Sequence, residues 1–200
     1  ILKFSSLKLD YLDKDKFKNK IKIFREKNDY ILQGDILNAN KIIEDLLKSK
    51  NNKKSTFFKD DLKLRLNIKK IYLDEDEIIK NLKGDLFFKN NDVFEANLNA
   101  IFLNQQKILF SIKTKEGDKI TTFFSGNAKP FVKRYKFIKG FEEGSLDFYS
   151  KKNNNKTVST LKIYDFKIKE LSVLTKILTL ASLQGIADLL SGEGIRFNEF

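Results

Sequence analysis

The chain has 200 residues, of which 41% are hydrophobic and 33% are charged, and its formal net charge is +12. It contains neither Cys nor His. Their absence from the sequence excludes disulfides and thiolate chemistry, and it removes the commonest transition-metal ligands and the usual general base near neutral pH. We therefore expect no enzyme, no catalytic residues, no cofactor and no metal. A single domain over residues 1–200 fits this length.

The positive charge is spread along the chain. Only four of the 39 cations are Arg, the side chain best suited to bidentate phosphate and base contacts. The lysines alternate with apolar residues, which is typical of the solvated face of a sheet, and a coding bias would also enrich Lys and Asn. We expect no nucleic-acid partner, although a weaker attraction to anionic lipid headgroups fits the charge.

Apolar residues alternate with polar ones over many short segments, as in strands that bury one face. Tight turns are predicted at residues 89–92 and 116–118, and an exposed hairpin loop at 151–156. We expect a meander of mostly antiparallel strands. The apolar rows, in chain order, are Leu7, Leu9 and Tyr11; Ile21 and Ile23; Leu62, Leu64, Leu66 and Ile68; Leu82, Leu86 and Phe88; Phe94, Ala96, Leu98, Ala100 and Phe102; Ile108, Phe110 and Ile112; and Ile120, Thr122 and Phe124.

Three segments have helical spacing instead. Residues 36–49 begin with Ile36 and Leu37 on one apolar stripe. Residues 128–138 follow Asn127, a good N-cap, and carry Pro130 in the first turn. Residues 171–190 are apolar around much of the helix, which favours packing on or capping the sheet over lying on a membrane surface. The candidate capping residues are Leu174, Ile177, Leu178, Ala181, Ile186 and Leu190.

Two smaller features leave alternatives open. Gly34, Gly84 and Gly144 each stand two residues before an apolar position, which is either a repeated strand feature such as a bulge or a coincidence. The acidic run at residues 74–77 lacks the glycine and the spacing of a calcium loop, so we interpret it as a solvated turn or a helix start.

The C-terminal half resembles a known family. Residues 124–148 lead through a short Pro-containing segment and Gly140 to the strand-like Gly144-Ser145-Leu146-Asp147-Phe148. Residues 160–197 run from Tyr164-Asp165-Phe166 into an apolar segment that ends at Gly192-Glu193-Gly194-Ile195-Arg196-Phe197. This order and spacing resemble the AsmA-like C-terminal region of bacterial envelope proteins, the superfamily of the YhdP-type and TamB-type proteins. The family often has Pro after the Asp-Phe strand, where this chain has Glu170-Leu171-Ser172.

The resemblance implies a curved antiparallel sheet that forms an open apolar groove. It also implies a non-enzymatic envelope scaffold that binds or conducts phospholipid acyl chains between the inner and outer membranes and supports outer-membrane integrity. Its expected partners are phospholipid, the envelope membranes and other envelope proteins. Its expected location is the periplasm, tethered to the inner membrane through a segment outside this chain, since the chain starts at Ile1 and we expect a piece of a longer protein.

The apolar rows can serve as groove lining or as ordinary core. The candidates are Leu62, Leu64, Leu66, Ile68, Leu86, Phe88, Phe94, Leu98, Phe102 and Phe110. A second hypothesis, from a different class, is a basic β-rich adaptor that binds an anionic polymer or another envelope protein.

Overall fold

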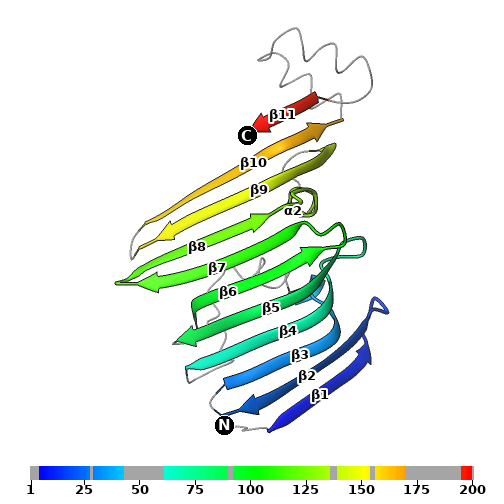
Figure 1. The fold of residues 1–200 in the computed structure, drawn as a ribbon, viewed down its shortest axis with the longest axis vertical. Helices are drawn as coiled ribbons and strands as arrows, with labels where there is room; N and C mark the ends of the chain where they lie inside the picture. Colours follow the sequence, from blue (N-terminus) through cyan, green and yellow to red (C-terminus); the bar gives the residue numbers. More distant parts are fainter. Residues whose placement is uncertain are drawn as a thin grey trace.

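In the computed structural model of the chain, eleven strands form one open sheet in sequence order (Figure 1). The structure describes residues 5–27, 29–42, 61–89, 92–135, 139–153, 156–169 and, by its backbone, 195–199. The expected mainly-β class and curved, unclosed sheet are confirmed. The strands are β1 (Ser6–Leu12), β2 (Lys18–Glu26), β3 (Asp29–Asn38), β4 (Leu62–Tyr72), β5 (Ile78–Lys89), β6 (Asp92–Phe102), β7 (Lys107–Lys115), β8 (Asp118–Ser125), β9 (Phe141–Lys152), β10 (Thr157–Ile168) and β11 (Ile195–Glu199).

The predicted meander is right for every neighbouring pair but one. β3 and β4 run parallel, with Leu32 beside Leu66 and Gly34 beside Ile68. The other nine pairs are antiparallel. Two parallel strands cannot be joined by a tight hairpin, because the chain must first return to the other end of the sheet. The sheet is therefore mixed.

The tight turns follow the chemistry that the sequence predicts. Glu116 and Gly117 join β7 to β8, and both have positive φ, at 52° and 87°. Two consecutive residues with positive φ match the backbone twist of a two-residue hairpin. The β9–β10 hairpin likewise turns after Lys152, where Asn153 Oδ1 accepts a hydrogen bond from the Lys156 amide at 3.0 Å.

One of the three predicted helices forms nearly where expected. α2 (Lys129–Tyr135) begins after Asn127, whose Oδ1 accepts a hydrogen bond from the Lys129 amide at 3.2 Å. The expected cap is confirmed, and residues 136–138 lie outside the described part of the chain. The candidate capping helix at 171–190 also lies outside it.

The helix predicted over residues 36–49 is wrong at its start. Ile36 and Leu37 belong to β3, and Leu37 pairs with Ile71 of β4. Helical geometry begins only at residues 40–42, and residues 43–49 are not described. β3 forms ladders with β2 on one side and with β4 on the other. These long-range hydrogen bonds override a local spacing that suits either structure.

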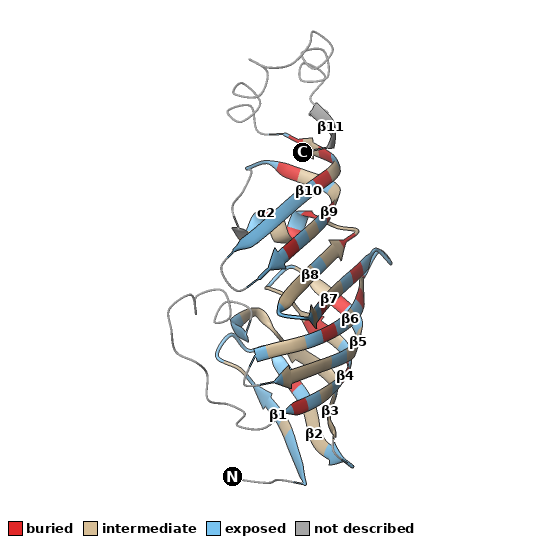
Figure 2. Cartoon of the chain, turned by 90° about the vertical axis from the view of Figure 1, so that its left-hand side faces the viewer, coloured by how far each residue is buried: buried red, intermediate tan, exposed pale blue. Residues whose placement is uncertain are grey.

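Alternation along the strands gives the sheet two chemically distinct faces. We call the face that carries Leu66, Leu98 and Phe110 the apolar face, and the face that carries Lys22, Asn67 and Lys83 the polar face. Figure 2 shows buried residues recurring along the strands between exposed ones. This follows from side chains that point to opposite sides at successive positions.

Among the described residues, two apolar clusters on the apolar face make up most of the core. One joins α2 to β9 and β10 through Val132, Leu146 and Phe166. The other centres on β4 to β7 and includes Ile68 and Phe102. Phe131 of α2 packs against both clusters, so the helix connects the two halves of the core.

The three glycines of the repeated pattern all lie where neighbouring strands approach closely. A Cβ at Gly84 would overlap the carbonyl oxygen of Asn97 on β6, and Gly84 has φ +143°. A Cβ at Gly34 would lie 2.7 Å from the Lys20 carbonyl oxygen, beside a register shift between β2 and β3. A Cβ at Gly144 would lie 2.9 Å from both the Phe166 Cβ and the Tyr164 carbonyl oxygen. The bulge interpretation is therefore supported at Gly34.

No helix among the described residues is both long and apolar enough to cross a membrane.

Candidate functional site

One row of apolar positions crosses ten strands without a polar interruption. Each member is the register partner of the next, from β1 to β10. We call this set the apolar row. Its members are Leu7, Ile23, Leu32, Leu66, Gly84, Leu98, Phe110, Phe123, Phe148 and Leu161.

The apolar row is accessible over most of its length. Only Leu66 among its members is buried, at 7% exposure. Leu7 and Leu161, at the two ends, are 42% and 37% exposed, and the members between them are half-buried except for Leu66. A row that served only as core would be most buried in its middle. Here the side chains on six strands, β2, β3 and β6 to β9, are half-buried.

The length of the apolar row suits a long apolar ligand. Neighbouring strands lie about 4.8 Å apart, so ten strands give a row of roughly 43 Å. An acyl chain spans one leaflet, which is about half of a bilayer hydrocarbon core roughly 30 Å thick. The row therefore exceeds the length of one acyl chain.

Nine of the ten predicted groove residues lie in the apolar row, in the positions beside it, or in the core. Leu66, Leu98 and Phe110 belong to the row. Leu64 and Leu86 pair with each other in the adjacent row, and Leu62 pairs with Phe88 beyond them. Ile68 and Phe102, at 1% and 2% exposure, are members of the core cluster.

Phe94 lies elsewhere, against the expected alternation. Its ring packs edge-on to Phe87, with centroids 5.8 Å apart, and Lys89 Nζ lies 5.3 Å from its centroid. Phe87 pairs with Lys63, which places this contact on the polar face. A register shift between β5 and β6 adds a residue here, and the extra residue turns the ring to the other side.

The alternation predicted for β8 is also wrong by one residue. Phe123, not Phe124, pairs with Phe110 on the apolar face. Thr122 lies on the polar face, where its hydroxyl is 2.7 Å from that of Ser111. In the segment Phe123-Phe124 either ring can face inward, so pattern alone does not decide the register.

Several members of the row are not among the groove residues predicted from alternation. Leu32 lies in the segment just before the predicted helix, Phe148 belongs to a strand-like segment with no face assigned, and Leu161 lies in no predicted apolar row. The predicted hairpin loop could have identified Leu161, because a short loop after Lys152 fixes the register of the two strands. That register makes Leu161 the partner of Phe148.

α2 is attached at one end of the strands by polar contacts. Arg134 donates a hydrogen bond from Nη2 to Asn40 Oδ1 at 2.9 Å and another to the Leu73 carbonyl oxygen. Lys133 forms an ion pair with Asp76 at 2.7 Å. These contacts hold the helix over the row where Phe123 meets Phe131.

The acidic run at residues 74–77 forms the turn after β4. Asp74 Oδ1 accepts hydrogen bonds from the amides of Asp76 and Glu77, at 2.9 and 2.8 Å. Burial, with the nearby Asp74 charge, raises the pKa of Glu77, while the Lys133 ammonium lowers that of Asp76. Of the two alternatives, the turn is therefore correct and the helix start is not. No cluster of three potential metal ligands occurs among the described residues.

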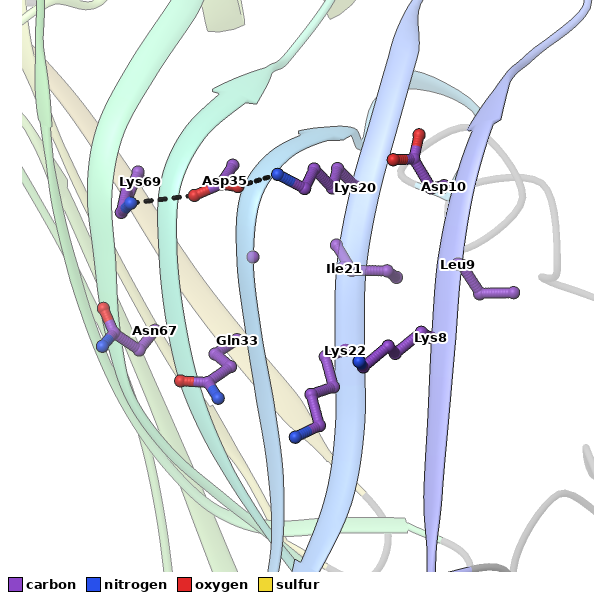
Figure 3. A pocket seen from close by; sticks show the side chains of 11 residues that line it. Lys8, Leu9, Asp10, Lys20, Ile21, Lys22, Gln33, Asp35, Asn67 and Lys69 are labelled. Atoms are coloured by element: carbon purple, nitrogen blue, oxygen red, sulfur yellow. Dashed lines mark hydrogen bonds and ion pairs between the residues drawn. The ribbon is translucent and has the colours of Figure 1, made fainter.

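Ion pairs bridge neighbouring strands on the polar face. Asp35 lies between Lys20 and Lys69, with both Nζ–carboxylate distances 2.8 Å (Figure 3). Hydrogen bonds from Lys20 and Lys69, and their charges, lower the pKa of Asp35 to about 2. Another such pair joins Lys151 of β9 to Asp118 of β8. The two faces therefore offer different chemistry, one apolar and one charged.

Comparisons of the chain with protein families, with characterised proteins and with solved structures found no match.

Proposed function

We propose that this chain is a non-enzymatic scaffold of the bacterial envelope whose apolar row holds phospholipid acyl chains. The observation that supports the proposal is the unbroken apolar row across ten strands, half-buried along most of its length. An acyl chain has no hydrogen-bonding groups, so a continuous apolar track is sufficient to bind it. The resemblance of residues 160–197 to the AsmA-like region supports the same function and a periplasmic location.

The energetics of such a track are favourable. Each methylene group removed from water contributes about 0.8 kcal/mol. An acyl chain that covers about ten methylenes would gain roughly 8 kcal/mol before the cost of immobilisation. The sheet formed by the described strands is open, which gives an acyl chain access from the side.

A pair of matched substitutions tests the proposal. Leu98→Gln places a polar group in the middle of the apolar row, whereas Leu109→Gln makes the same change on the polar face, where Leu109 is 47% exposed. We expect purified chain to carry phospholipid detectable by native mass spectrometry. The first variant should bind a fluorescent fatty acid about tenfold more weakly, and the second should bind it like the unsubstituted chain.

Two results would reject the proposal. One is a chain that neither co-purifies with phospholipid nor binds the fatty acid after gentle extraction. The other is equal binding by the Leu98→Gln and Leu109→Gln variants, because the row would then play no part.

A further inference from the structure

The polar face is hollowed over β1 to β4, opposite the apolar row. The hollow has a volume of about 400 Å³ and is lined by side chains from all four strands (Figure 3). Lys8 and Lys22 extend on one side of the sheet, while Leu9 and Ile21 point to the other. The hollow therefore belongs to the polar face and is separate from the proposed acyl site.

A cross-strand row of hydrogen-bond donors forms the floor of the hollow. Lys8 pairs with Lys22, Lys22 with Gln33, and Gln33 with Asn67. Each ammonium group offers three donors, and each carboxamide offers two. Four strands at about 4.8 Å spacing place this row within roughly 14 Å, which the long lysine side chains shorten further.

The two lysines of this row, Lys8 on β1 and Lys22 on β2, lie directly opposite each other. Like charges that face each other across a strand pair destabilise the sheet. Lys22 Nζ lies 4.6 Å from the centroid of the Phe24 ring, and no carboxylate partner of Lys8 or Lys22 occurs among the described residues. A bound anion would relieve this repulsion.

The nearest carboxylates are already neutralised. Asp35 is held between Lys20 and Lys69, and Asp10 forms an ion pair with Lys18. The register shift beside Gly34 places Asp35 in this position, because it adds a residue to β3 between two partners of β2. Lys20 and Lys69 share a single carboxylate, so the hollow keeps an excess of positive charge.

We propose that this hollow, centred on Lys8, Lys22, Gln33 and Asn67, binds the phosphate group of an anionic small molecule or lipid headgroup. Phosphate oxygens accept several hydrogen bonds at once, which matches a row of ammonium and amide donors. Lys acts here as a point charge, as it does at other phosphate sites. The phosphate site does not depend on the acyl site, because the two lie on opposite faces of the sheet.

Titration of the full chain with inorganic phosphate tests the site. In ¹⁵N-resolved NMR spectra we expect saturable shifts of the Gln33 and Asn67 side-chain amides. The double variant Lys8→Gln, Lys22→Gln should weaken binding at least tenfold. A matched control, Lys113→Gln with Lys156→Gln, removes two exposed lysines outside the hollow and should leave the affinity within twofold.

Two further measurements separate binding from folding and identify the source of the phosphate. The Lys8→Arg, Lys22→Arg variant keeps both charges and should bind within about threefold of the unsubstituted chain. Binding to phosphatidylglycerol vesicles, but not to phosphatidylcholine vesicles, would identify an anionic lipid headgroup. Binding to inorganic phosphate without binding to either vesicle would identify a soluble phosphate compound.

The proposal is overturned if phosphate leaves the Gln33 and Asn67 amides unshifted. It is equally overturned if the control pair weakens binding as much as the Lys8 and Lys22 substitutions do, because the effect would then be one of net charge. Loss of lipid binding by Leu98→Gln has no bearing on this site, so the two proposals fail separately.

Discussion

Phe123 of β8 lies edge-on to Phe131 of α2, with ring centroids 4.8 Å apart and an angle of 74° between the ring planes. Phe123 belongs to the apolar row, and Phe131 contacts both core clusters. This contact therefore links α2 to the apolar row. Edge-to-face rings contribute about 0.5–1.5 kcal/mol beyond the area they bury.

Phe131→Ala should destabilise the fold and uncover the centre of the row. We expect the free energy of unfolding to fall by about 2–3 kcal/mol, below the loss for a fully buried Phe because Phe131 is half-buried. Urea denaturation measures the change. Lys129→Ala on the same helix is the control, and an equal loss there would show that the ring contact is not the cause.

Arg134→Met should loosen α2 from the end of the sheet. The substitution keeps much of the side-chain volume but leaves the Leu73 carbonyl and Asn40 without their donor. Loss of a hydrogen bond to a charged donor costs about 1.5–3 kcal/mol. Compared with the unsubstituted chain, the variant should show faster hydrogen exchange in α2, with a smaller change in β6. Lys133→Met removes only an exposed ion pair and should have the smaller effect.

Gly84→Ala should be among the most destabilising single-methyl changes in the sheet. The new Cβ would overlap the Asn97 carbonyl oxygen, and the φ of +143° is strained for any residue with a side chain. We expect a loss of more than about 2 kcal/mol in unfolding free energy. A Cβ at Gly126 would lie 3.0 Å from the Gln106 side chain and 3.3 Å from the Lys107 amide nitrogen, and Gly126 has no positive φ, so Gly126→Ala serves as the milder control. Equal melting temperatures for the two variants would contradict the close strand approach.

Asp35 should make the fold sensitive to acid. Its pKa is about 2 in the folded chain against an ordinary value of 3.8, so its ion pairs stabilise fully above about pH 4. That contribution is lost as the pH falls through about 2, because the protonated carboxyl no longer attracts Lys20 and Lys69.

A comparison of melting temperatures measures this effect. Asp35→Asn should melt below the unsubstituted chain at pH 6, and the difference should disappear near pH 2. Gln33→Ala changes an exposed residue of the same strand that carries no charge, so its effect on the melting temperature should not depend on pH. A difference for Asp35→Asn that persists at pH 2 would show that packing, not charge, is responsible.

Much of this architecture follows from local pattern. Alternation defined the strands around Leu64, Leu98 and Phe110, because a strand turns successive side chains to opposite faces. Turn chemistry at Glu116-Gly117 and the Asn127 cap defined a hairpin and a helix start, since both depend on neighbouring residues alone. The lack of Cys and His is likewise a property of the sequence.

Other features depend on partners far along the chain. Ile36 and Leu37 fit a helix by spacing, yet ladders to both β2 and β4 make them strand. Pattern also could not decide between Phe123 and Phe124, and a bulge moved Phe94 to the polar face.

The sequence by itself therefore determined most of the strand segments, the Glu116-Gly117 turn and the Asn127 cap, because these depend on neighbouring residues. The tertiary structure decided which residues stand side by side, including the unbroken apolar row and the Lys8–Lys22 pair. The physical reason is that register is set by hydrogen bonds between strands, and a shift of one residue moves every side chain to the opposite face.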